Sequence, residues 1–104
     1  MRIISGKYRG AKLYSPEDNR VRPTTDRIKE SVFNIICSRL NVYGATVLDL
    51  FSGSGALGLE AYSRGAKKVV FIDNDKDSIR LTKSNIAKLD RVLYCPKKAG
   101  KQAV

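Results

Sequence analysis

Apolar and polar positions along the chain follow two different periods, which predict two kinds of secondary structure. Continuous apolar, β-prone runs occur at Thr46–Phe51 and Lys68–Asp73, and each is too short to form a helix of its own. Helical spacing begins after Thr24, Thr25 or Asp26, any of which can cap a helix. The predicted buried stripe of this helix consists of Ile28, Val32, Ile35, Ile36 and Leu40, with Phe33 alongside.

Two further helices are expected after the two apolar runs. One covers Leu57–Arg64 and is stopped by Gly65 at a C-cap position. The other begins after a cap at Asn74 or Asp75. Its predicted buried face consists of Ile79, Thr82, Ile86 and Leu89.

The two ends of the chain carry weaker patterns. Arg2–Tyr14 has Gly6 and Gly10 between short β-prone pieces, which predicts a β-hairpin or two short strands. Arg91–Cys95 is expected to start a third strand. Strands that alternate with helices predict an α/β fold with a parallel sheet and right-handed crossovers. A ligand is then expected at the carboxyl ends of the strands.

A glycine-rich turn follows the first apolar run. Gly53, Gly55 and Gly58 have the G-x-G-x-x-G spacing of nucleotide-binding loops. In this spacing the first glycine makes the tight turn and the second lets the backbone approach a ligand. The third lets the helix pack closely on the strand. The turn therefore predicts a nucleotide-type cofactor site.

Two acidic residues indicate which cofactor this site takes. Asp73 ends the second apolar run, where its carboxylate can accept hydrogen bonds from two ribose hydroxyls. Asp49 lies four residues before Gly53, and an anion there would disfavour a pyrophosphate at the helix N-terminus. It suits a cationic ligand such as S-adenosylmethionine, which carries an ammonium and a sulfonium. Asp49 is also expected to accept hydrogen bonds from amides of the turn.

The chain has 104 residues and a formal net charge of +10, which favours an acidic partner, nucleic acid above all. The excess positive charge lies toward the two ends of the chain, because residues 41–75 carry three basic and four acidic groups. Cations interleave with aromatic rings in the N-terminal segment, a composition suited to phosphates and stacked bases. The candidate RNA contacts are Arg2, Lys7, Tyr8, Arg9 and Lys12. A solvated strand that caps the fold explains the same composition equally well.

Several other classes of protein are disfavoured. Cys37 and Cys95 are isolated, and histidine is absent, so no metal site is expected. Cys37 is expected in or near the core. Nothing resembles a signal peptide, and no apolar run approaches the roughly 20 residues of a membrane span. The expected setting is a reducing cytoplasm.

Three separated motifs resemble one family. They are Met1–Gly10 (MRIISGKYRG), Arg22–Arg27 (RPTTDR, followed by Phe33-Asn34) and Asp49–Ala61 (DLFSGSGALGLEA). Together they resemble the bacterial small-subunit rRNA methyltransferase D family over roughly residues 1–90. The resemblance implies S-adenosylmethionine-dependent enzymes that methylate N2 of one guanine in 16S ribosomal RNA. It also implies that 16S rRNA or the assembling small subunit is the partner.

The resemblance implies specific cofactor contacts. The methionine half of the cofactor would lie against the loop that includes Asp49, Phe51, Gly53, Ser54 and Gly55, and its ribose against Asp73. Polar residues of the helix-cap region would lie beside the methionine end: Arg22, Thr24 and Thr25. The N-terminal hairpin would contribute to recognition of RNA or the ribosomal particle.

One family motif has no match in these 104 residues. Such enzymes carry an Asn/Asp-Pro-Pro-Tyr/Phe tetrapeptide after a fourth strand, which receives the target amine and stacks on the extruded base. We therefore expect a partial Rossmann-like class I methyltransferase fold with an N-terminal hairpin. The expected segments are residues 1–22 (basic hairpin and loop), 23–95 (truncated cofactor-binding domain) and 96–104 (basic, disordered tail).

Methyl transfer by this chain alone is not expected, because the acceptor motif is absent. A fragment that binds RNA or cofactor without catalysis remains an alternative hypothesis. An NAD-dependent oxidoreductase is a weaker one, because Asp49 and the N-terminal motifs disfavour it. Oligomeric state is left open.

Overall fold

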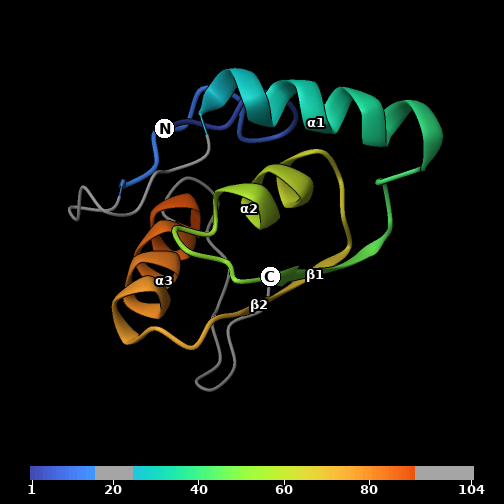
Figure 1. Cartoon of the computed structure of the whole chain (residues 1–104). Coiled ribbons are helices and arrows are strands. Elements are labelled where there is room, and N and C mark those ends of the chain that lie inside the picture. Colours follow the sequence, from blue (N-terminus) through green and yellow to red (C-terminus); the bar gives the residue numbers. More distant parts are fainter. Residues whose placement is uncertain (16–24, 91–104) are drawn as a thin grey trace.

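The computed structural model describes residues 1–15 and 25–90 of the chain (Figure 1). Its elements are α1 (Asp26–Arg39), β1 (Thr46–Leu50), α2 (Ala56–Ser63), β2 (Lys68–Ile72) and α3 (Lys76–Asp90). Their order is the one predicted, with boundaries one or two residues away from those expected. The predicted third strand at Arg91–Cys95 and the tail at 96–104 lie outside the described residues.

Strands β1 and β2 form a parallel pair that runs from Thr46 opposite Lys68 to Leu50 opposite Ile72. Helix α2 connects the two strands and packs on both of them. Figure 1 shows α1 and α2 on the same side of this two-stranded sheet. The strand–helix–strand unit confirms the predicted α/β class with a parallel sheet.

The helix ends follow local sequence signals. The Thr25 hydroxyl accepts a hydrogen bond from the amide of Ile28 and so caps α1. Asp75 caps α3, because its carboxylate accepts from the amide of Ser78 at 2.9 Å. Gly65 follows α2 with a φ of +111°, a left-handed conformation that ends a helix at little steric cost only for glycine. Thr25, Asp75 and Gly65 therefore act as predicted.

Two apolar clusters form the core. The first joins the N-terminal extension (residues 1–14) to α2 and α3, through Ile3, Tyr8, Leu13, Ala56, Leu59, Ile86 and Leu89. The second joins α1 to α2 and β2, through Phe33, Ala61, Ala66 and Val69. Since apolar burial drives folding, the extension is part of the packed structure and not an appendage.

The extension doubles back on itself as predicted, although it forms only a short hairpin. Arg2 and Lys12 make a single antiparallel bridge. The amide of Ile3 donates to the carbonyl oxygen of Ala11 and the amide of Leu13 to that of Met1, both at 2.9 Å.

The predicted buried stripe of α1 is wrong. Ile28, Val32, Ile35 and Leu40 are 40–67% exposed, and Ile36 is half-buried. The buried residues of α1 are Lys29 and Phe33, and Cys37, expected near the core, is exposed. Periodicity identifies the apolar face of a helix but not the surface that covers it. In the described part of the chain, α1 packs through its Phe33 side instead.

The far face of the sheet is also open to solvent. Leu48, Leu50 and Ile72 point away from α2 and are about half exposed. No helix among residues 1–15 and 25–90 is long and apolar enough to cross a membrane.

Candidate cofactor site

The glycine loop (residues 51–55) joins β1 to α2 at the carboxyl end of the sheet. The amide of Gly55 donates to the carbonyl oxygen of Ser52 at 2.8 Å, which closes the turn. The amide of Ser52 donates to the carbonyl oxygen of Ile72 at 3.1 Å and ties the loop to β2. Gly53 and Gly55 have φ values of +57° and +82°, which favour glycine because it lacks a Cβ.

Gly58 lies where α2 approaches β2 most closely. A Cβ at this position would lie 2.3 Å from Cε1 of Phe71 and 2.9 Å from Cγ1 of Val69. The predicted role of the third glycine, close packing of helix on strand, is confirmed.

Asp49 lies beneath the start of α2 and is 8% exposed. Its Oδ2 accepts a hydrogen bond from the amide of Gly58 at 3.0 Å, as expected for an acid facing the turn. Oδ1 has no hydrogen-bond donor among the described residues. Burial raises the pKa of Asp49, repulsion from Asp73 raises it further, and the Gly58 amide partly opposes both. A cationic ligand would relieve this uncompensated acid.

Asp73 holds the glycine loop from β2. Its Oδ2 accepts from the amide of Gly53 and its Oδ1 from the amide of Asp75, both at 2.9 Å. A carboxylate has about four lone-pair positions, so these two bonds leave room for ribose hydroxyls. The contact between Asp73 and a ribose stays a prediction.

Two polar residues of α3 also position the loop, and they were missed from the sequence. The Thr82 hydroxyl donates to the carbonyl oxygen of Gly53 at 2.7 Å. Nδ2 of Asn85 donates to the carbonyl oxygen of Ser54 at 2.8 Å. Both side chains are almost fully buried. Their only sequence signal is polarity on the apolar face of a helix, where Thr82 was read as a core position.

Asn85 also contacts the N-terminal extension. Its Oδ1 accepts from the amide of Tyr14 at 2.7 Å, and its Nδ2 donates to the carbonyl oxygen of Tyr14 at 3.2 Å. One side chain therefore links α3, the glycine loop and the extension.

Phe51 is the only residue other than glycine with a positive φ among the described residues, at +57°, and it is 83% exposed. A bulky side chain in this conformation stores backbone strain, which often marks a functional position. The neighbouring Ser54 is buried, and its hydroxyl points to the sulfur of Met1 at 3.8 Å.

The predicted cap-region contacts are only partly within the described residues. Thr25 uses its hydroxyl to cap α1. Arg22 and Thr24 lie outside the described residues. A contact between the cofactor and Arg22, Thr24 or Thr25 stays a prediction.

Four of the five candidate RNA contacts are exposed, and one is buried. Arg2, Lys7, Arg9 and Lys12 are exposed, as phosphate contacts must be. Tyr8 is 6% exposed, and its ring stacks on Tyr62 with centroids 5.9 Å apart. That ring is part of the first apolar cluster, so little of it is open to solvent, and an RNA contact by Tyr8 stays a prediction.

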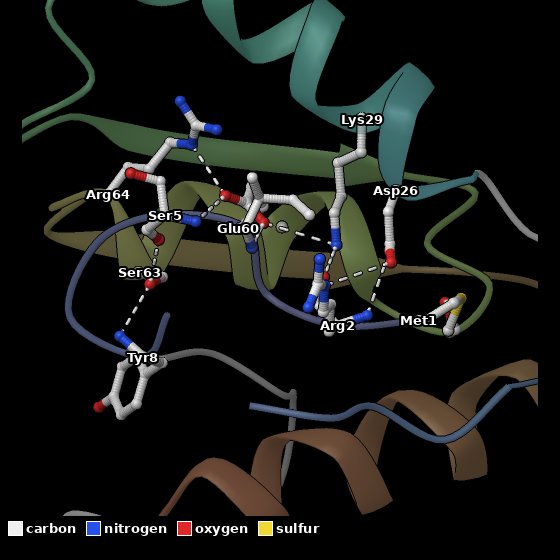
Figure 2. Close-up of polar contacts among 12 residues, drawn as sticks. Met1, Arg2, Ser5, Tyr8, Asp26, Lys29, Glu60, Ser63 and Arg64 are labelled. Atoms are coloured by element: carbon white, nitrogen blue, oxygen red, sulfur yellow. Dashed lines mark hydrogen bonds and ion pairs between the residues drawn. The ribbon is translucent and has the colours of Figure 1, made fainter. Parts of the chain in front are cut away.

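A buried carboxylate holds the extension on α2 and α1 (Figure 2). Glu60 is fully buried and accepts from the amides of Ile4 at 2.9 Å and Ser5 at 3.1 Å. It pairs with Nζ of Lys29 at 3.5 Å and with Nε of Arg64 at 2.9 Å. The signal for this cluster is a lone acid in the otherwise uncharged helix ALGLEAYS. No group of acidic, cysteine or histidine side chains within residues 1–15 and 25–90 could hold a metal ion.

Comparison with known proteins relates this architecture to a family. The family described as "Conserved hypothetical protein 95" matches residues 1–102, nearly the whole chain. The chain belongs to this family. A Bacillus subtilis relative, YlbH, provisionally named an rRNA methyltransferase, is 46% identical over 90 residues. That match covers 86% of this chain and 48% of the relative.

Two Escherichia coli comparisons agree. Ribosomal RNA small subunit methyltransferase D is 44% identical over 89 residues, covering 86% of this chain and 44% of the relative. A solved structure with a provisional methyltransferase name has a TM-score of 0.74 and 41% identity, covering 86% of this chain and 47% of that one. The resemblance seen in the sequence motifs is confirmed. The chain spans about half the length of the curated relatives it matches.

Proposed function

We propose that the chain binds S-adenosylmethionine and serves the methylation of N2 of a guanine in 16S ribosomal RNA. The observation that carries the proposal is Asp49, a buried acid of β1 next to the glycine loop, with one carboxylate oxygen that receives no hydrogen bond from the described residues. A buried acid at this position favours a cationic ligand over a pyrophosphate. The rRNA methyltransferase names of the relatives support the substrate class.

In this proposal, the residues of the chain bind the cofactor and orient it. When bound, S-adenosylmethionine supplies an electrophilic methyl group on a positively charged sulfur. Asp49 offsets positive charge at the methionine half, and Asp73 accepts from the ribose hydroxyls. Gly53 and Gly55 let the backbone approach, while Thr82 and Asn85 fix the carbonyl oxygens of the loop. Preorganised polar groups of this kind favour a defined orientation of the reacting group.

The exposed cations of the extension support an RNA partner. Arg2, Lys7, Arg9 and Lys12 are available to backbone phosphates, and the chain has a net charge of +10. We propose that the partner is 16S rRNA, free or in the assembling small subunit, and that the protein acts in the cytoplasm.

Calorimetric titration tests the cofactor. S-adenosylmethionine should bind, and NAD should give no heat of binding. Asp49→Asn should lower the affinity for S-adenosylmethionine about 10–100-fold, because a charge-assisted contact is lost. Asp77→Asn, which removes an exposed acid of α3, is the matched control. Tight NAD binding would favour an oxidoreductase. RNA binding without S-adenosylmethionine binding would favour a non-catalytic module.

An experiment in cells tests the identity of the methylated base. Deletion of the gene region that encodes this chain should remove one N2-methylguanosine from 16S rRNA. Mass spectrometry of the digested nucleosides measures it. An unchanged N2-methylguanosine content would contradict the proposed specificity and leave the cofactor result untouched.

A further inference from the structure

A groove of about 410 Å³ lies between the N-terminal extension and the first turns of α1. The extension lines it with residues 2–4, 9 and 10, and α1 with residues 26, 27 and 30. Three of the lining side chains are arginines and two are carboxylates. Its walls belong to segments that are far apart in the sequence, so no local motif marks it.

Of the charged side chains that line the groove, Arg2 and Asp26 pair with each other. Oδ1 of Asp26 accepts from the amide of Arg2 at 3.2 Å, and Oδ2 lies 3.7 Å from Nε of Arg2 (Figure 2). The side chains of Arg9, Arg27 and Glu30 are exposed and make no hydrogen bond or ion pair with the described residues. Among the described lining residues, these two guanidiniums and one carboxylate leave an excess of one positive charge.

Buried groups hold the floor of the groove in place. Nζ of Lys29 donates to the carbonyl oxygen of Arg2, and the Glu60 carboxylate accepts from the amides of Ile4 and Ser5. Lys29 and Glu60 are both fully buried, and Figure 2 shows them beside Arg2 and Ser5 of the extension. A rigid floor lowers the entropy lost when a ligand binds.

The edge at Gly10 leaves room for a ligand to approach the backbone. The amide of Gly10 donates to the carbonyl oxygen of Ile3 at 2.9 Å, which places Arg9 and Gly10 beside the floor. Apart from the two chain neighbours of Gly10, no described residue has an atom within 4 Å of the position that its Cβ would occupy.

We propose that this groove binds a backbone phosphate of RNA between Arg9 and Arg27. Guanidiniums bind phosphate oxygens in a bidentate fashion. A phosphodiester carries one negative charge, which matches the excess positive charge, whereas a multiply charged free phosphate would meet the carboxylate of Glu30. The inference rests on the proposed function in that RNA is the ligand. It adds Arg27 to the predicted contacts and leaves out Lys7, Tyr8 and Lys12.

Fluorescence anisotropy with a fluorescein-labelled 16S rRNA hairpin tests the groove. Arg9→Ala/Arg27→Ala should lower the affinity about tenfold and reduce the slope of log K against log salt by about one. Arg80→Ala/Lys83→Ala removes the same charge from the exposed face of α3 and should change the affinity less than twofold. Equal losses in the two double variants would show a general charge effect and overturn the proposal.

Glu30→Gln supplies a test in the opposite direction. It removes the uncommitted acid of the groove and should tighten RNA binding about two- to fivefold, whereas Asp77→Asn should not. Weaker or unchanged binding by Glu30→Gln would overturn the proposal. A second outcome would also overturn it. If Arg9→Ala/Arg27→Ala binds RNA normally but no longer binds a labelled polyglutamate peptide, the groove belongs to a protein partner.

Calorimetry with S-adenosylmethionine separates the two proposals. Arg9→Ala/Arg27→Ala should bind S-adenosylmethionine as the unaltered chain does. If the unaltered chain binds S-adenosylmethionine but the arginine variant binds RNA normally, the groove proposal fails and the proposed function stands. If the unaltered chain binds RNA through the two arginines but not S-adenosylmethionine, the cofactor proposal fails and the groove stands.

Discussion

The side-chain amide of Asn85 donates to the carbonyl oxygen of Ser54 at 2.8 Å, so a residue of α3 fixes a loop 31 positions earlier in the chain. The same side chain makes two hydrogen bonds with the backbone of Tyr14. The cofactor loop and the N-terminal extension thus share one buried anchor. A substitution of Asn85 should therefore affect the structure of both segments.

Asn85→Ala should destabilise the fold by about 2–3 kcal/mol, because it leaves the buried carbonyl group of Ser54 and the partly buried backbone groups of Tyr14 without this partner. Urea denaturation followed by circular dichroism measures the loss. Ser84→Ala alters an exposed side chain one position earlier on α3 and should change stability by less than about 0.5 kcal/mol. If the two variants unfold at the same urea concentration, the anchor role of Asn85 is wrong.

Asp49→Asn should make stability less dependent on pH. The folded state raises the pKa of Asp49 above its ordinary value of 3.8, chiefly through burial. The folded protein then binds the proton more tightly than the unfolded chain, so the contribution of Asp49 to stability is lost as pH rises through the folded pKa. The gain in free energy of unfolding from Asp49→Asn should therefore be smallest below pH 3.8 and increase as pH rises above it. Urea unfolding at a series of pH values measures this gain.

Ligand binding at Asp49 should show the opposite pH dependence. A cation needs the ionised carboxylate, so affinity for S-adenosylmethionine should fall as pH is lowered through the raised pKa of Asp49. Asp77→Asn is the control for both measurements, because this side chain is exposed. An affinity that does not change with pH would argue against a cation beside Asp49.

Phe51→Gly should separate stability from binding. Glycine relieves the strain at a φ of +57°, and the 83% exposed ring contributes little burial, so the variant should be about 0.5–1 kcal/mol more stable. It should bind S-adenosylmethionine more weakly, because the ring is lost from the loop. Phe51→Ala keeps the backbone strain and removes the ring. Phe51→Ala should bind S-adenosylmethionine as weakly as Phe51→Gly does and should be as stable as the unaltered chain. Any other combination of affinity and stability contradicts the role assigned to Phe51.

Glu60→Gln should destabilise the fold by about 3–5 kcal/mol, because it leaves the fully buried Lys29 ammonium without its counter-charge. Thermal and urea unfolding measure the effect. Glu30→Gln removes an exposed acid and should cost less than about 0.5 kcal/mol. Adding Lys29→Met to Glu60→Gln should recover part of the loss, and no recovery would assign the effect to the other contacts of Glu60, with Arg64 and the amides of Ile4 and Ser5.

Features that depend on neighbouring residues were predictable from the sequence. The glycine spacing, the Gly58 contact and the Thr25 and Asp75 caps each follow from residues a few positions apart. The parallel pairing of β1 and β2 follows from one strand–helix–strand unit.

Features that depend on which distant segments meet were not predictable. The apolar stripe of α1 has a clear period, yet its Phe33 side is the buried one. Tyr8 has the composition of an RNA contact but stacks on Tyr62. Glu60 and Asn85 look like ordinary polar positions until the extension, 55 to 71 residues earlier, is placed against them.

The separation between the extension and its anchors has a consequence for synthesis of the chain. Ile4 and Ser5 bond to Glu60, and Tyr14 bonds to Asn85, so these contacts form only after the later residues have been made. At about 5–20 residues per second, Tyr14 waits roughly 4–14 s for Asn85, the last partner of the extension. Its apolar side chains are available to ribosome-associated chaperones during this interval. The extension is thus translated before the residues that hold it and packs only after them.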